Sequence, residues 1–145
     1  MKNHMTEEIK RFNHLTGEIE GLYHEAALRL GFSDSIMQIL YTICCIGDGC
    51  PLSDICKLSG ARKQTINSSI RILEKDGLVY LKALDGRTKT VYLTERGKLT
   101  VDGTVSRLID IENQIFVSWT KEEREEYLRL TKAYMTAFKE RIMSL

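Results

Sequence analysis

The segment 78-LVYLKALDGRTKTVYLTERG-97 decides the fold, because two runs rich in β-forming residues flank the dipeptide Asp85-Gly86. Asp-Gly between two such runs is a strong signal for a β-hairpin, since a type I′ turn needs positive φ at both central positions. A two-residue turn here would pair Tyr80 with Val91 and leave one side of the hairpin apolar. We therefore expect a small hairpin that packs one face on neighbouring helices.

Two short helices separated by a turn are expected just before the hairpin. A glycine-rich loop over residues 47–51 leads into the first helix, which has Ser53 as its N-cap and ends at Gly60. The second helix continues to Asp76, and its apolar residues have the spacing of one helix face: Ile66, Ile70 and Leu73. This order predicts a helix-turn-helix, and the hairpin adds a wing to it.

Long amphipathic helices are expected on both sides of this lobe. Residues 6–30 carry an apolar side chain at every third or fourth position, and a further helix follows with Ser33 as its N-cap. After the hairpin we expect one long helix from Thr94, and then a last helix that opens with a capping box of Thr120 and Glu123. The fold class is therefore mainly α with a small β-hairpin wing, a winged helix-turn-helix with N- and C-terminal helical arms.

The 145 residues carry a formal net charge of +1, but the charge is unevenly distributed. Residues 57–98 hold 10 basic and 4 acidic side chains, whereas the rest of the chain holds 11 and 16. A basic centre is typical of proteins that bind nucleic acids. No apolar run reaches the roughly 18 residues of a membrane helix, and residues 1–8 lack the apolar core of an export signal. We expect a cytoplasmic protein with no membrane contact.

These features resemble those of the MarR family of bacterial transcriptional regulators. Residues 85–97 look like the family's wing signature, an Asp-x-Arg that leads into Val-x-Leu-Thr-x-x-Gly, and residues 65–79 are similar to its recognition helix and the entry to its wing. The resemblance covers nearly the whole chain, although only residues 52–97 carry specific motifs. Arg62 is a departure, because it stands where family members often carry a small helix-capping residue.

The resemblance implies a single domain over residues 1–145, with a DNA-binding lobe at 33–97 and dimerisation arms at 1–32 and 98–145. It also implies a homodimer that binds a near-palindromic site on double-stranded DNA, by family habit as a repressor. The apolar stripes of the arms fit this expectation, since a two-fold partner is the simplest place to bury them. The alternative is that the arms pack only on their own domain.

The expected DNA contacts fall on the second short helix and on the hairpin. On the helix, amide and basic side chains suit base edges and phosphates, and the candidates are Arg62, Lys63, Gln64, Thr65, Asn67, Ser68 and Arg71. At the hairpin tip, Arg87 suits the narrow minor groove. Asp85 is expected to orient an Arg, and Lys82 and Lys89 are expected to contact phosphates on either side of the hairpin.

The resemblance further implies a pocket, where the arms meet the lobe, for a small aromatic or anionic effector. Its candidate lining residues are Phe12, Tyr23, His24, Arg29 and Tyr41. Of the four cysteines, Cys50 lies in the glycine-rich loop and is the one expected to be exposed, so a thiol-based redox-sensing regulator is one alternative function. Another alternative is a winged-helix protein-interaction module that binds no DNA.

Other chemistry is not expected. The cysteine spacing contains no CxxC pair, which disfavours zinc. Glu20 and His24 are one helical turn apart, but a solvated pair is the simpler reading of them, so no metal and no cofactor is predicted. The sequence also lacks a phosphate loop, a nucleophile elbow and a paired acid–base set. We therefore predict that the protein is not an enzyme.

Overall fold

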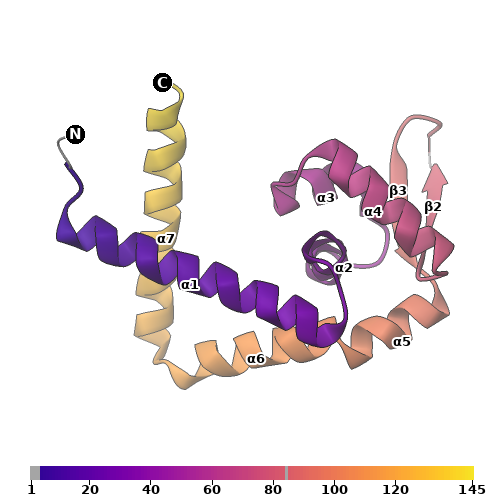
Figure 1. Ribbon diagram of the computed structural model, residues 1–145, viewed down its shortest axis with the longest axis horizontal. Helices are drawn as coiled ribbons and strands as arrows, with labels where there is room; N and C mark the ends of the chain where they lie inside the picture. Colours follow the sequence, from indigo (N-terminus) through magenta and orange to yellow (C-terminus); the bar gives the residue numbers. More distant parts are fainter. Residues whose placement is uncertain (1–3, 84) are drawn as a thin grey trace. The chain divides into compact units, whose positions relative to one another are not determined.

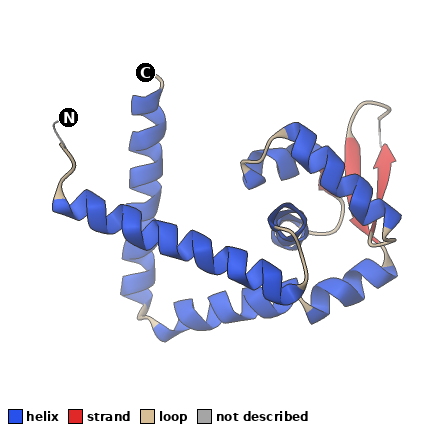
Figure 2. Ribbon diagram, in the orientation of Figure 1, coloured by secondary structure: helices blue, strands red, loops and turns tan. Residues whose placement is uncertain are grey.

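The computed structural model describes residues 4–83 and 85–145, which form ten helices and strands (Figures 1 and 2). In chain order these elements are α1 (Glu7–Leu30), α2 (Asp34–Ile46), β1 (Cys50–Pro51), α3 (Leu52–Ser59), α4 (Lys63–Lys75), β2 (Val79–Ala83), β3 (Lys89–Leu93), α5 (Glu95–Gly103), α6 (Val105–Ser118) and α7 (Lys121–Ile142). The chain divides into two compact units, Met1–Arg107 and Leu108–Leu145. The predicted fold class, mainly α with a small β wing, is confirmed.

Helices α2, α3 and α4 form the helix-turn-helix core of the first unit. Figure 1 shows α2 end-on beside α3 and α4, and α2 packs against both of them. Its buried residues meet Ile55 of α3 and the buried face of α4 in one apolar core. The predicted buried face of α4 is confirmed, because Ile66, Ile70 and Leu73 are all buried.

The hairpin forms, but its register differs from the expected one. Val79 pairs with Leu93, Tyr80 with Tyr92, and Ala83 with Lys89. This moves the pairing by one residue from a two-residue turn and turns Tyr80 away from the buried side. The apolar side is instead formed by Val79, Leu81, Val91 and Leu93, as the alternation of side chains along each strand requires.

The side chain of Asp85 explains this register. One carboxylate oxygen, Oδ1, accepts hydrogen bonds from the backbone N–H groups of Arg87 (3.1 Å) and Thr88 (2.8 Å). An aspartate that binds the backbone two and three residues later replaces a strand-to-strand bond and widens the turn. The strands therefore end at Ala83 and Lys89. The expected first strand extended to Leu84, which lies outside the described residues.

Residues 47–51 were expected to be a loop, but Cys50 and Pro51 form a short third strand. In this strand Cys50 pairs with Val91 and Pro51 with Thr90, so β3 is the central strand of the sheet. Proline is tolerated there because β1 is an edge strand. The expected Ser53 cap on α3 is wrong for a related reason: β1 runs directly into the helix, and Pro51 occupies the N-cap position.

The helix expected from Thr94 onward is broken into α5 and α6. Gly103 is a weak helix former, and Thr104, which follows it, leaves the helical region with φ −130° and ψ −85°. The hydroxyl of Thr104 donates a hydrogen bond to the carbonyl oxygen of Thr100, so this carbonyl group near the end of α5 has a partner. The other predicted caps are confirmed, including Ser33 and Thr94.

The second unit contains most of α6, together with α7. The capping box of Thr120 and Glu123 is present in full. Arg124 donates from Nη1 to the carbonyl oxygens of Phe116 (3.2 Å) and Trp119 (2.6 Å), which fixes the turn between the two helices. Within residues 4–83 and 85–145, no helix is long and apolar enough to cross a bilayer.

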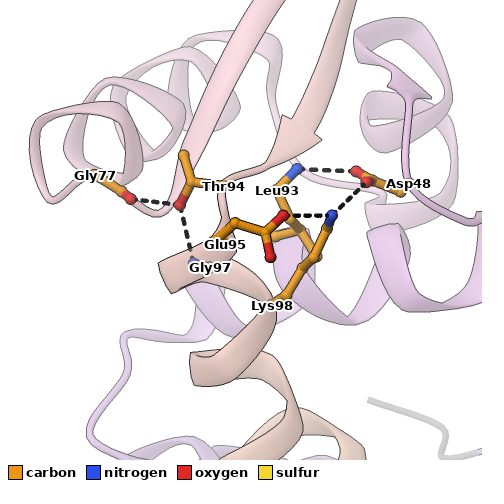
Figure 3. Close-up of polar contacts among 7 residues, drawn as sticks. All are labelled: Asp48, Gly77, Leu93, Thr94, Glu95, Gly97 and Lys98. Atoms are coloured by element: carbon orange, nitrogen blue, oxygen red, sulfur yellow. Dashed lines mark hydrogen bonds and ion pairs between the residues drawn. The ribbon is translucent and has the colours of Figure 1, made fainter.

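Thr94 joins the end of α4 to the start of α5 (Figure 3). Its hydroxyl donates to the carbonyl oxygen of Gly77 (2.6 Å) and accepts from the N–H of Gly97 (2.9 Å). Its own N–H donates to the carbonyl of Leu78 at 3.0 Å. Gly97 lies so close to this segment that a Cβ atom on it would overlap the Leu78 carbonyl. Only glycine therefore fits at position 97 without a steric clash.

Replacing Gly97 with alanine is expected to lower the free energy of unfolding by about 2 kcal/mol or more, because the new methyl group must displace backbone. Gly103→Ala in the same helix is the matched control, since a Cβ there meets nothing within 4 Å. Because Gly103 is the last residue of α5, its replacement should leave the free energy of unfolding within about 1 kcal/mol of wild type. Urea unfolding of both variants measures the difference, and equal stabilities would contradict the close approach at Leu78.

Candidate nucleic-acid interface

Helix α4 presents a polar face on the side opposite the core. Its residues at i, i+4 and i+7, Gln64, Ser68 and Arg71, are exposed and lie across the helix from Ile66. Of the other expected contacts, Arg62, Lys63 and Thr65 are exposed at the start of the helix, and Asn67 is half-buried. The hydroxyl of Ser68 donates to the carbonyl of Gln64 at 2.9 Å, so this hydroxyl offers a ligand mainly its acceptor capacity.

The first turn of α4 has an open N-terminus. Arg62 is the N-cap, and within the described chain no side-chain hydrogen bond caps this end. The departure noted at Arg62 thus leaves backbone N–H groups without a side-chain acceptor. Such groups carry the positive end of the helix dipole and suit a phosphate.

Lys75 is a further basic residue on this face that the sequence analysis missed. It lies four residues after Arg71 and eleven after Gln64, so it continues the same exposed stripe at the end of α4. Extending the helical spacing past Arg71 would have found it. The polar face of α4 thus offers the amide of Gln64 near its beginning and cations at both ends.

The tip of the wing is held by its own backbone contacts. Besides the two backbone N–H groups, the carboxylate of Asp85 accepts a bond from the hydroxyl of Thr88 (3.4 Å). These hydrogen bonds, of which the one from the Thr88 backbone is the strongest, hold the pKa of Asp85 below its usual value. Asp85 therefore orients Arg87 through the main chain, by fixing the turn that carries the exposed Arg87 side chain.

The two lysines of the wing lie on opposite sides of the hairpin. Lys82 pairs with Thr90 in the register, whereas Lys89 pairs with Ala83, so their side chains alternate to opposite faces. Both are exposed. On the same side as Lys82, the rings of Tyr80 and Tyr92 stack with their centroids 5.3 Å apart. The wing therefore presents a cation on each flank and an arginine at its tip.

The five candidate effector residues lie on two helices. Tyr41 is half-buried on α2, and the other four belong to α1. Phe12 precedes Tyr23 by eleven residues, which is about 16 Å along a helix. Tyr23, His24 and Arg29 lie in the second half of α1, where the helical spacing directs their side chains to different sides, and Phe12 lies about three turns before Tyr23.

Acidic side chains already contact the two basic members of this group. Nδ1 of His24 lies 2.8 Å from Oδ1 of Asp34, at the first turn of α2. Nε of Arg29 donates to Oε1 of Glu25 at 2.8 Å. An anionic ligand would have to compete with these carboxylates. In the described part of the chain, no group of three His, Cys, Asp or Glu side chains lies close enough to hold a metal ion.

The expectation that Cys50 is exposed is wrong. Its side chain is fully buried, and Cys50 belongs to strand β1, where it pairs with the buried Val91 of β3. Burial, with a smaller effect from Asp54, raises the pKa of the Cys50 thiol to about 11. Since the thiolate is the species that reacts with oxidants, Cys50 is a poor redox sensor. The exposed cysteine is Cys45, on α2.

Iodoacetamide at pH 8 is expected to label Cys45 first and to leave Cys50 unmodified in the folded protein. With a pKa of about 11, roughly one Cys50 thiol in a thousand is ionised at that pH, and burial blocks even that fraction. Mass spectrometry of peptides measures the order of labelling. Cys45→Ser should remove the fast phase, and labelling of Cys50 as fast as Cys45 in folded protein would contradict its burial.

Comparison with solved structures supports the fold assignment, although no family model and no curated protein matches the sequence. A MarR-family regulator from Silicibacter pomeroyi is 25% identical over 86% of each chain, with a TM-score of 0.69. A MarR-family regulator from Neisseria meningitidis is 17% identical over 96% of this chain and 98% of its own, with a TM-score of 0.77.

A third similar structure is MepR from Staphylococcus aureus in complex with DNA. It is 20% identical over 93% of this chain and 99% of its own, with a TM-score of 0.68. MarR-family proteins are transcriptional regulators and not enzymes. Because the likeness covers both arms as well as the lobe, this chain has the winged helix-turn-helix fold of the MarR-family transcriptional regulators.

Proposed function

We propose that this protein is a sequence-specific DNA-binding transcriptional regulator that binds a near-palindromic site as a homodimer. The observation that carries the proposal is the combination of the polar face of α4 with the exposed Arg87 at the tip of the wing, both in the same compact unit. MepR, which has a similar fold, is known in complex with DNA. A repressor is the form of regulation we propose, by blocking access to the bound site.

Helix α4 has the chemistry that the major groove requires. The amide of Gln64 can bond in pairs to adenine, and Arg71 and Lys63 can bind guanine or phosphate. Gln64 and Lys63 lie in the first turn of the helix, and residues near the beginning of a recognition helix are those that reach base edges. Lys75, at the far end of the same helix, is suited to the phosphate backbone.

The wing has the chemistry of the adjacent minor groove. That groove is about 6 Å wide and electronegative where it narrows, so a guanidinium on a thin hairpin tip suits it. The hydrogen bonds of Asp85 fix the turn before Arg87 meets DNA, which reduces the conformational entropy lost on binding. Lys82 and Lys89, one on each flank, are suited to the phosphates on either side.

Dimerisation is proposed because both arms leave large apolar side chains exposed. On α1 these residues recur at helical spacing and include Ile9, Leu15, Ile19 and Leu22. On α7 they include Leu128, Met135, Phe138 and Ile142. Exposed apolar side chains repeated at helical spacing favour an interaction site, and a second copy of the chain would bury the same side chains in both partners.

We further propose that a small aromatic or anionic effector releases the protein from DNA. The support is the position of Tyr23, His24 and Arg29, which lie where α1 leads into α2. The contact between His24 and Asp34 joins these two helices. A ligand that displaced either side chain would favour a different arrangement of α1 and α2, and so change the affinity for DNA.

Replacing Arg87 with alanine is expected to weaken binding to duplex DNA by about 1–3 kcal/mol without changing stability, because the Arg87 side chain is exposed and the turn is held through its backbone N–H. Mobility shift with a duplex selected from random sequence, repeated at several salt concentrations, measures the loss. Lys121→Ala on α7 removes the same charge and should bind as wild type. Wild-type affinity in Arg87→Ala, or no salt-dependent DNA binding by the unmodified protein, would contradict the proposal and favour a protein-interaction module.

Replacing Leu15 with glutamate is expected to convert the dimer into a monomer, because Leu15 is 55% exposed in one chain and buried only if a partner covers it. Lys10→Glu places a carboxylate on the opposite side of α1 and should remain dimeric. Light scattering coupled to size exclusion measures the mass of each variant. A wild-type protein that is monomeric at micromolar concentration would argue against this role for the arms.

A further inference from the structure

The loop between α2 and β1 carries a carboxylate that contacts the base of the wing. Oδ1 of Asp48 accepts a hydrogen bond from the N–H of Leu93 at 2.9 Å, across 45 residues of sequence (Figure 3). Its other oxygen lies 3.9 Å from Nζ of Lys98, which also binds Glu95 at 2.9 Å. Asp48 thus contacts the last residue of β3 and a residue of α5.

The hydrogen bond between Asp48 and Leu93 lies just beyond the end of β1, the shortest strand of the sheet. In the β1–β3 ladder Cys50 pairs with Val91 and Pro51 with Thr90. Continuing that register would place Asp48 opposite Leu93. The backbone of the loop does not follow a strand there, and the Asp48 side chain supplies the acceptor that a strand would have supplied. The N–H of Leu93 is therefore satisfied by a side chain from the α2–β1 loop.

The loop has the shape that this contact requires. Gly47 and Gly49 on either side of Asp48 have φ values of +112° and +88°, which favour glycine. A Cβ on Gly49 would lie 2.9 Å from Cε1 of Tyr92, so the loop backbone lies directly against that ring. Tyr92 in turn stacks on Tyr80 of the other wing strand. The loop after α2 thus packs against Tyr92 of β3, and through the ring of Tyr92 against Tyr80 of β2.

We propose that Asp48 is a positioning residue for DNA binding, which sets the direction of the wing relative to the helix-turn-helix through its bond to Leu93. The proposal rests on the DNA-binding function proposed above. Leu93 and Lys89 are four residues apart, about 14 Å along a strand. A rotation of about 10° at Leu93 would therefore move the tip by about 2–3 Å, nearly half the width of a minor groove of about 6 Å.

The hydrogen bond to Leu93, and not the charge of Asp48, carries this role. The ion pair with Lys98 is long, both side chains are about half exposed, and an exposed pair of this kind contributes little. Asparagine at position 48 retains an acceptor oxygen for Leu93, whereas alanine does not. The two substitutions therefore separate the hydrogen bond from the charge.

The test measures DNA affinity by fluorescence anisotropy for wild type, Asp48→Asn, Asp48→Ala, Arg87→Ala and the double variant Asp48→Ala/Arg87→Ala. The duplex is one selected by the wild-type protein. Asp48→Ala should weaken binding about three- to tenfold, the effect of one hydrogen bond, and Asp48→Asn should bind within about twofold of wild type. Asp110→Ala removes the same charge from α6 and should also bind as wild type.

The double variant distinguishes positioning from a general structural effect. If Asp48 acts through the wing, Asp48→Ala should cause a clearly smaller loss of affinity once Arg87 has been removed, because only the wing contacts of Lys82 and Lys89 then remain to be misplaced. An equal loss in the presence and absence of Arg87 would overturn the proposal, and so would Asp48→Asn binding as weakly as Asp48→Ala. Urea unfolding of each variant gives the folded fraction used in the affinity calculation.

Hydrogen exchange of the Leu93 amide tests the contact without DNA. Exchange should be faster in Asp48→Ala and close to wild type in Asp48→Asn. An unchanged rate in Asp48→Ala would overturn the proposal at the level of the contact. Wild-type protein that binds no duplex, together with the expected exchange rates, would instead show that the proposed function fails while the Asp48–Leu93 bond is present.

Discussion

The backbone of α5 approaches the backbone at Leu78 so closely that only a glycine at position 97 fits between them. The hydroxyl of Thr94 adds two hydrogen bonds at this place: it donates to the carbonyl oxygen of Gly77, after α4, and accepts from the N–H of Gly97 in α5. Three elements therefore meet at one place: the end of α4, the base of the wing and the start of α5. If this junction opened, the polar face of α4 and the tip of the wing would lose their fixed relation to each other.

Two polar contacts at the base and the tip of the wing complement this junction. Asp48 holds the last residue of β3 from the α2 side, and Asp85 fixes the turn that carries Arg87. Both are aspartates whose side-chain oxygens accept hydrogen bonds from backbone N–H groups. The wing is thus held at its base and at its tip before any DNA is bound. A hairpin ordered in this way loses less conformational entropy when it binds. In the proposed function, the excess of basic residues over 57–98 would attract the DNA, and these contacts would orient the protein on it.

Features determined by neighbouring residues were predictable from the sequence. The caps at Ser33, Thr94 and Thr120 and the buried face of α4 depend on side chains a few positions apart, and each was found correctly. The Asp85-Gly86 signal also predicted a hairpin at the right place. Its register was missed because the type I′ rule considers only the backbone, whereas the Asp85 side chain binds two N–H groups and widens the turn.

Features that depend on distant residues were not predictable in this way. Strand β1 forms because Cys50 and Pro51 pair with residues of β3 some forty positions later in the chain. The same pairing buries Cys50, and burial raises the pKa of its thiol. Asp48 looked like an ordinary loop residue because its partner, Leu93, is 45 residues away. Of the candidate site, the polar residues of α4 and Arg87 followed from pattern and resemblance. Lys75 was missed although the helical spacing of α4 already pointed to it, whereas the role of Asp48 required the three-dimensional structure.

Hydroxyl-radical footprinting of the wild-type protein on a selected duplex tests most directly whether α4 and the wing bind DNA together in two copies. We predict two protected patches related by two-fold symmetry and about one helical turn apart, each with a major-groove centre and protection of the minor groove beside it. Uniform cleavage along the duplex at low salt, or a single patch without a symmetric partner, would contradict the proposed dimeric regulator.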